Sequence, residues 1–155
     1  MPRIVRLTRY TEKDAPGESL ENARCICGLG MEGDIYDRGG DRQLSLLCLE
    51  TRQWMDTLVK MDFESSIDGL CLSKYRENIL LDGIRPDELV PGFRLKTGEV
   101  LLEISDIPKR CFKECTFLSN GRKCFLAGQY LFAKVIHGGS IKAGSRIARC
   151  REKIE

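Results

Sequence analysis

The chain has 155 residues, which is enough for a single domain, residues 1–155, with its own hydrophobic core. Its net charge of +2 gives no general electrostatic reason to expect nucleic-acid binding. We see no secretory signal and no apolar run near the roughly 20 residues of a spanning helix, so we expect a cytoplasmic protein without a membrane partner.

The pattern along the chain predicts short strands separated by turn signals. We expect strands at residues 3–9, 22–27, 43–49, 69–73, 77–81, 93–96, 100–104, 131–136 and 145–150. A helix is expected at residues 50–63, where Trp54 and Met55 begin an apolar face. Many short strands with one or two helices and no βαβ rhythm favour a mainly β fold, either a β-barrel or a strongly bent sheet.

Eight cysteines are many for a chain without a secretory signal, so reduced thiols are expected rather than a disulfide framework. Cys48 and Cys71 lie in apolar surroundings and are interpreted as buried packing residues. Cys25 and Cys27 share one predicted strand, where a period of two would point both to the same face.

Residues 109–124 combine Cys111, Cys115 and Cys124 with five Lys or Arg and one Glu. A basic setting favours the thiolate, which is the form that attacks electrophiles and binds metals. The same charges suit an anionic ligand such as a phosphate. A zinc site with His137 as a further ligand is an alternative, although the second close pair of ligands of a typical zinc site is missing.

Two other segments carry groups that suit phosphate. Residues 28–33 match G-x-G-x-x-G, but residues 34–41 cannot form the helix that a dinucleotide site requires. A flexible turn, or a loop whose amides line an anion site beside Arg42, are the remaining interpretations. Arg76 and Asn78 offer a guanidinium fork and an adaptable amide at the start of a predicted strand.

Taken in order, these segments resemble the MOSC family, named for the C-terminal domain of molybdenum cofactor sulfurases. The resemblance rests on G-M-E-G-D at residues 30–34, R-Q-L-S-L-L at 42–47, E-N-I at 77–79, the paired segments at 91–103, the cysteine segment, and the last strands from residue 128. Three features of the sequence depart from the family pattern. Tyr36 replaces a common histidine, the glycine loop is about one residue longer, and Gly144-Ser145 stands where G-D is usual.

The resemblance implies a β-barrel like the barrel domain of pyruvate kinase, and it implies molybdenum-pterin cofactor chemistry. Cys111 matches the cysteine that ligates molybdenum or carries sulfur, with Cys115 as a second candidate ligand. Arg76 and Asn78 match a pair that lines the cofactor pocket in relatives. Lys109, Arg110 and Arg42 would join Arg76 around the phosphate, and Gly33 and Asp34 lie in the loop that would supply amides.

Two functional hypotheses follow. The first is a MOSC-type protein that binds molybdenum or its pterin cofactor, as a sulfur or metal carrier or as a cofactor-dependent transferase or oxidoreductase. Its partners would be proteins of cofactor biosynthesis or molybdoenzymes. The second is a non-catalytic β-barrel binding module whose cysteines hold a structural zinc ion.

Overall fold

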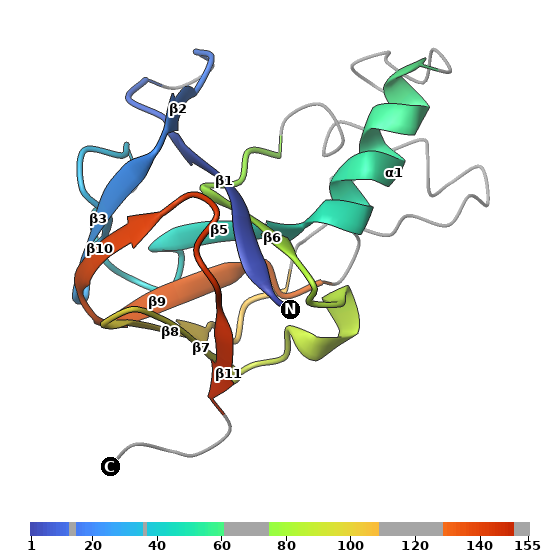
Figure 1. Ribbon diagram of the computed structural model, residues 1–155. Helices are drawn as coiled ribbons and strands as arrows, with labels where there is room; N and C mark the ends of the chain where they lie inside the picture. Colours follow the sequence, from blue (N-terminus) through green and yellow to red (C-terminus); the bar gives the residue numbers. More distant parts are fainter. Residues whose placement is uncertain (13–14, 36, 61–74, 109–128, 151–155) are drawn as a thin grey trace.

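The computed structural model describes residues 1–12, 15–35, 37–60, 75–108 and 129–150, with the side chains of 58–60 excepted. In these ranges the chain is mainly β, with one α-helix and one short 3₁₀ helix (Figure 1). The elements in chain order are β1 (Arg3–Arg9), β2 (Glu18–Leu20), β3 (Asn22–Ile26), β4 (Gly30–Met31), β5 (Leu44–Cys48), α1 (Leu49–Lys60), β6 (Ile79–Asp82), η1 (Pro86–Glu88), β7 (Arg94–Thr97), β8 (Val100–Ile104), β9 (Phe132–His137), β10 (Gly139–Lys142) and β11 (Ala148–Cys150).

The strands form two sheets. Eight strands pair in the order β11-β7-β8-β9-β5-β6-β1-β2, and three pair in the order β10-β3-β4. Most pairs are antiparallel, whereas β5 and β6 run parallel, joined by the crossover that contains α1. That crossover satisfies the need of parallel neighbours for a long connection.

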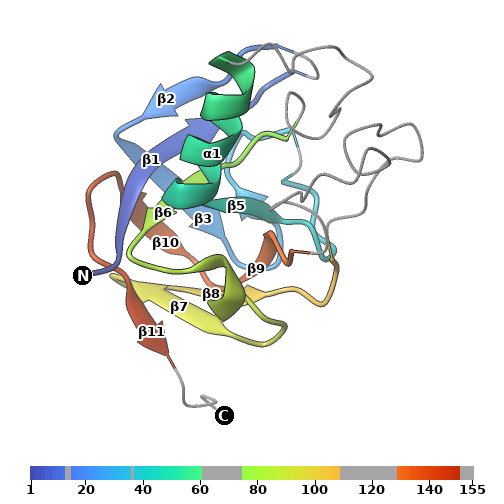
Figure 2. The same ribbon diagram turned by 90° about the vertical axis from the view of Figure 1, so that its right-hand side faces the viewer.

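Among the described residues the strand ladders do not close into a barrel, because the large sheet has β11 at one end of its order and β2 at the other. The expected barrel is therefore not confirmed. The sheet nevertheless bends far enough for β1 to meet the chain just before β11 (Figures 1 and 2). The amide of Ile4 donates to the oxygen of Ser145 at 2.8 Å, and Arg3 and Arg146 form an isolated bridge.

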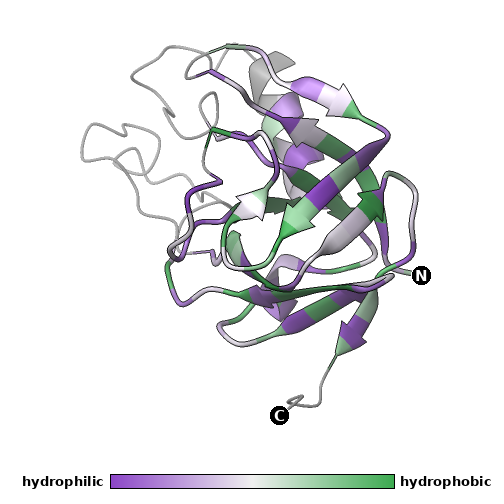
Figure 3. Cartoon of the chain, turned by 90° about the vertical axis from the view of Figure 1, so that its left-hand side faces the viewer, coloured by the Kyte–Doolittle hydropathy of each residue, from purple (hydrophilic) through white to green (hydrophobic). Residues whose placement is uncertain are grey.

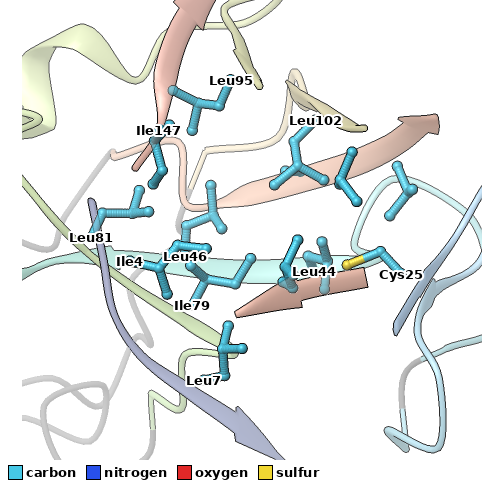
Figure 4. Packing of buried hydrophobic residues seen from close by; sticks show 14 of the residues in the cluster. Ile4, Leu7, Cys25, Leu44, Leu46, Ile79, Leu81, Leu95, Leu102 and Ile147 are labelled. Carbon is cyan, nitrogen blue, oxygen red and sulfur yellow. The ribbon is translucent and has the colours of Figure 1, made fainter. Parts of the chain in front are cut away.

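The main core lies inside this bend, where residues from nearly every strand meet (Figure 4). Hydrophilic and hydrophobic residues alternate along several strands, as Figure 3 shows, so that one face of each strand is buried. In β1 the alternation is interrupted by an irregularity between Ile4 and Arg6. This shift places Ile4 and Leu7, three positions apart, on the same buried face.

The helix α1 packs over β5 and β6 (Figure 2). Met55 is fully buried with Leu47, Leu80 and Leu131 in a second, smaller cluster, and Trp54 packs against that cluster. The predicted apolar face of the helix is thus confirmed for Trp54 and Met55.

Three short strands were not expected from the sequence: β2, β4 and β10. β2 is largely exposed at a sheet edge, β4 has two residues inside the glycine loop, and β10 begins at Gly139, the second of two consecutive glycines. The expected shared face for Cys25 and Cys27 is wrong, because β3 ends at Ile26 and Cys27 is exposed in the following turn. The predicted strand at residues 69–73 lies outside the described residues.

Candidate functional site

Asn78 joins three segments that the sequence motifs placed far apart. This residue is only 4% exposed and lies directly before β6. Its side-chain nitrogen donates to the Asp34 carboxylate at 3.0 Å and to the backbone oxygen of Thr8 at 3.1 Å, and its side-chain oxygen accepts from the amide of Ser45 at 3.0 Å. Asn78 therefore fixes the glycine loop, β1 and β5 relative to one another.

Ser45 completes this junction from the side of β5. Its hydroxyl donates to the backbone oxygen of Arg76 at 2.8 Å and accepts from the amide of Asn78 at 2.9 Å. The parallel pairing of β5 and β6 begins immediately afterwards, at Leu46 and Ile79. The serine of the R-Q-L-S-L-L segment and the asparagine of E-N-I thus set the register of the only parallel strand pair in the described part of the chain.

Asp34 is a buried carboxylate, 2% exposed, and it serves the same junction. It accepts hydrogen bonds from the backbone amide of Tyr10 at 2.8 Å and from Asn78. Such charge-assisted bonds to buried donors hold a loop firmly. Asp34 therefore positions Asn78 and the start of the segment that follows β1.

The glycine loop is shaped by contacts that only glycine permits. At Gly30, with φ of 136°, a Cβ atom would lie 2.3 Å from the backbone oxygen of Gln43. The Gln43 side chain in turn donates to the oxygen of Gly40 at 2.8 Å and accepts from the amide of Val135 at 2.9 Å. Gln43 thereby ties the loop to β9.

Several amides of this loop are engaged within the chain. The amide of Gly33 donates to the Asp37 carboxylate at 3.1 Å, that of Gly28 to the oxygen of Val135 at 3.0 Å, and that of Gly39 to the oxygen of Leu29 at 3.2 Å. These bonds support the loop itself. The expected role of the loop as a supplier of anion-binding amides is thus not evident at these three positions.

Arg42 is exposed and lies directly before Gln43 and β5. Its guanidinium carbon lies 5.0 Å from the centre of the Phe132 ring, a cation–π arrangement. The Phe132 ring meets the edge of Tyr75, with centroids 6.4 Å apart. A chain of aromatic contacts therefore connects Arg42 to the segment that carries Arg76.

Beside the junction is a polar cleft of about 360 Å³, which we call the arginine cleft. Its lining comes from β1, the segment before β2, α1 and the segment before β6. The residues that line it are Arg6, Tyr10, Pro16, Gly17, Arg52, Asp56, Tyr75, Arg76 and Glu77.

Glu77 is the centre of the arginine cleft and is only 3% exposed. One carboxylate oxygen accepts from Arg6 at 3.0 Å, and the other accepts from Arg52. One buried carboxylate thus holds both guanidinium groups in place. Their hydrogen bonds replace those that water would make to Glu77.

Arg76 enters the arginine cleft from the same segment as Glu77. Its guanidinium donates to the backbone oxygen of Ala15 and lies over the ring of Tyr10, 5.5 Å from the ring centre. Stacking and a backbone contact together fix the plane of the guanidinium group.

The two tyrosines of the cleft remain protonated at neutral pH. Burial raises the pKa of Tyr10 above its ordinary value, and the Glu77 carboxylate adds to this shift. Burial likewise raises the pKa of Tyr75 well above its ordinary value. Their hydroxyls act as donors, Tyr10 to the backbone oxygen of Glu77 at 3.2 Å and Tyr75 to that of Leu46 at 2.6 Å.

The other predicted site residues, Lys109, Arg110, Cys111 and Cys115, lie outside the described residues. Within the ranges that the structure describes, no group of three or more His, Cys, Asp or Glu is arranged to hold a metal ion. Likewise, no helix of the described ranges is long and apolar enough to cross a membrane.

Sequence reasoning missed most of the arginine cleft. Arg6 lies in the strand expected at residues 3–9 and Arg52 in the helix expected at residues 50–63, and neither belonged to a motif. Glu77 was noticed only as a neighbour of Arg76 and Asn78. A signal was available in Glu77 itself, since a carboxylate directly before a buried strand requires cationic partners.

The fold and these contacts define a class: a mainly β domain in which motif residues meet at a buried polar junction beside an arginine-lined cleft. The family model described as "MOSC domain" matches residues 34–148. The chain therefore belongs to the MOSC domain family, as the sequence resemblance predicted.

Three solved structures of similar fold come from bacteria. The YUAD protein from Bacillus subtilis aligns with a TM-score of 0.64 and 14% identity, covering 95% of this chain and 94% of that one. YiiM from Escherichia coli aligns with a TM-score of 0.64 and 17% identity, covering 99% and 72%. YiiM from Geobacillus stearothermophilus aligns with a TM-score of 0.62 and 14% identity, covering 97% of this chain and 76% of that one. No curated protein matches the chain.

Proposed function

We propose that this protein binds molybdenum in the form of its pterin cofactor and uses Cys111 as a metal ligand or sulfur carrier. The family is associated with this cofactor. The observation that carries the proposal is the meeting of Asp34, Ser45 and Asn78, which come from three separate motif segments, at one buried junction. The backbone of Arg76 bonds to Ser45 of this junction, and Arg76 also lines the arginine cleft.

The described residues fit the anionic end of such a cofactor. Arg76 is held by Tyr10 and Ala15 with its guanidinium plane fixed, as bidentate recognition of a phosphate requires. Arg42 is held over the Phe132 ring, and in the proposal it supplies a second cation for the same ligand. In the proposal Lys109 and Arg110 add two further charges. In the proposal Asn78, Asp34 and Gly33 hold the segments that form the wall of the site.

Cys111 supplies the thiol chemistry in this proposal. Basic neighbours stabilise a thiolate, and a thiolate is the form required both for metal ligation and for carrying sulfur. Cys115 is a second ligand in the same segment. When bound, the cofactor would supply redox chemistry at molybdenum, and the protein would orient it and control access of water.

The proposed role is that of a sulfur or metal carrier, or of a cofactor-dependent transferase or oxidoreductase. Proteins of cofactor biosynthesis or molybdoenzymes are the partners that such a role requires.

Elemental and chromophore analysis tests the proposal. The protein is expressed in a host that makes the molybdenum cofactor, purified without chelators, and analysed for molybdenum, zinc and pterin fluorescence. We expect molybdenum together with a pterin signal. Zinc that disappears in a Cys111→Ala/Cys115→Ala double variant, without molybdenum, would support the zinc module instead.

A further inference from the structure

The arginine cleft contains more positive charge than its carboxylates balance. Three guanidinium groups, from Arg6, Arg52 and Arg76, line it, against the carboxylates of Asp56 and Glu77. Asp56 is a weak partner, because its side chain is 61% exposed and lies 3.9 Å from Arg52. Three cations against two carboxylates thus leave the lining of the cleft with a net positive charge.

The arginines are oriented by contacts that leave part of each guanidinium uncommitted. Arg6 and Arg52 each use one terminal nitrogen for Glu77. The Nε atom of Arg52 is buried and has no hydrogen-bond acceptor among the described residues. A buried donor without an acceptor costs free energy, so the Arg52 side chain gains if a small shift brings its Nε atom to an acceptor oxygen in the cleft.

The position of Glu77 explains why the cleft is preorganised. Both of its oxygens are occupied by arginines that come from different elements, β1 and α1. The negative charge of Glu77 offsets the repulsion between the two guanidinium groups, so they remain close before any ligand binds. Little side-chain entropy is then lost when an anion enters.

From this geometry we infer that the arginine cleft is an oxyanion subsite that takes a phosphate group, with Arg6 and Arg52 as its principal donors. Guanidinium groups recognise phosphate by paired hydrogen bonds, and three of them surround one small polar hollow here. Arg6 and Tyr10 precede residues 34–148, so the family match does not include this part of the subsite. The inference deepens the proposed function, since the cofactor's phosphate is one candidate occupant.

Titration of the protein purified without cofactor tests the subsite. Inorganic phosphate is followed by calorimetry at low ionic strength, with chloride added at matched ionic strength as the non-specific reference. We expect saturable binding that weakens about ten-fold or more in Arg52→Gln and in Arg6→Gln, the loss expected for a charge-assisted hydrogen bond. A repeat with phenyl phosphate distinguishes free phosphate from a phosphate monoester as the preferred occupant.

Arg94→Gln is the matched control. Its side chain is 17% exposed, against 18% for Arg52, and it also pairs with a carboxylate, Glu103 at 2.9 Å, away from the cleft. This variant should bind phosphate like the wild type. Arg6 is 47% exposed, so Arg6→Gln keeps the test available if Arg52→Gln fails to fold.

Two outcomes would overturn the inference: no saturable phosphate binding by the wild type, or equal affinity in the wild type, Arg6→Gln and Arg52→Gln. Cys111→Ser separates this result from the proposed function, because it should bind phosphate normally while failing to retain molybdenum. Phosphate binding without any molybdenum uptake would leave the subsite standing and remove the cofactor proposal.

Discussion

Burial separates two of the described cysteines, Cys25 and Cys48, from the exposed Cys27. Cys25 and Cys48 are 1% and 2% exposed, and burial raises the pKa of each thiol to about 12. Cys27 is exposed, and its thiol donates to the backbone oxygen of Ile136 at 3.1 Å. Thiolate chemistry near neutral pH is therefore closed to Cys25 and Cys48 in the folded state.

Alkylation with iodoacetamide at pH 8, followed by peptide mass spectrometry, should label Cys27 quickly and Cys25 and Cys48 only slowly. Unfolding in guanidinium should make all three react at similar rates, because burial is the cause of the difference. Rapid labelling of Cys48 in the native protein would contradict the described core.

At this scale the sequence pointed to residues whose structural role it did not reveal. Asn78 and Asp34 were expected to bind the cofactor; in the described structure both are buried and bond to the chain, and a contact with a ligand stays a prediction. Arg6 and Arg52 carried no motif. Their importance comes from a contact with Glu77 across separations of 71 and 25 residues, and residue spacing along the chain gives no indication of such a contact.

At the scale of elements, the glycine loop shows how a motif becomes a constraint on packing. Gly28 and Gly30 both have positive φ, but only Gly30 is pressed against another backbone segment. Nothing lies within 4 Å of a Cβ atom added to Gly28. The two glycines can therefore be compared: an alanine at Gly28 strains the backbone without a collision, whereas one at Gly30 adds a collision to the strain.

We predict that Gly30→Ala destabilises the protein by about 3 kcal/mol or more, since strain and overlap with the Gln43 oxygen add together. Gly28→Ala should cost only about 1–2 kcal/mol, the penalty of a left-handed conformation. Urea unfolding followed by circular dichroism measures both. Equal losses in the two variants would show that the close approach to Gln43 has no energetic weight.

The main strands and the helix were largely predictable, because hydrophobic periodicity reports burial directly. β1 was predicted with its observed bounds, and α1 was predicted at 50–63 and observed at Leu49–Lys60. The strands that were missed are short or glycine-containing, such as β4 and β10. Pairing with β3 stabilises both of them, and this tertiary effect leaves no periodic pattern in the sequence.

At the scale of the whole molecule, one ion pair ties the last strand to the middle of the chain. Arg149 in β11 donates to both oxygens of Glu88, at 2.8 and 3.1 Å, and also to the oxygen of Gly83 at 2.9 Å. The Arg149 hydrogen bond, aided by the backbone amide of Arg85, lowers the pKa of the Glu88 carboxyl below its ordinary value. Ionised Glu88 is thus favoured in the folded state.

This shift predicts a pH-dependent contribution to stability. A carboxyl with a lowered folded pKa stabilises the fold fully above its unfolded value, about 4.3, and this contribution is lost as the pH falls through the folded value. Glu88→Gln should lower the melting temperature by a few degrees at pH 7, since the pair is partly exposed and screened. The difference from the wild type should shrink below about pH 4.

Differential scanning calorimetry at pH 7 and at pH 3 measures this change, with Glu32→Gln as a control for loss of an exposed carboxylate. A difference between Glu88→Gln and the wild type that is the same at both pH values would show that the Glu88 charge does not contribute.

The overall topology was the least predictable level. A mainly β fold followed from many short strands, but the strand order and the open ladders did not. They depend on which strand edges meet. One example is the isolated bridge between Arg3 of β1 and Arg146. The family resemblance anticipated membership in the MOSC domain family, and that prediction is confirmed.

The most direct test of the central claim compares molybdenum content in three forms of the protein made in a cofactor-producing host: wild type, Cys111→Ser and Cys27→Ser. Cys27 is the control, since it is an exposed cysteine outside the proposed site. We predict molybdenum and a pterin signal in the wild type and in Cys27→Ser, with loss of molybdenum in Cys111→Ser. Equal molybdenum in all three forms would contradict a ligand role for Cys111, and its absence from all three would contradict the proposed function.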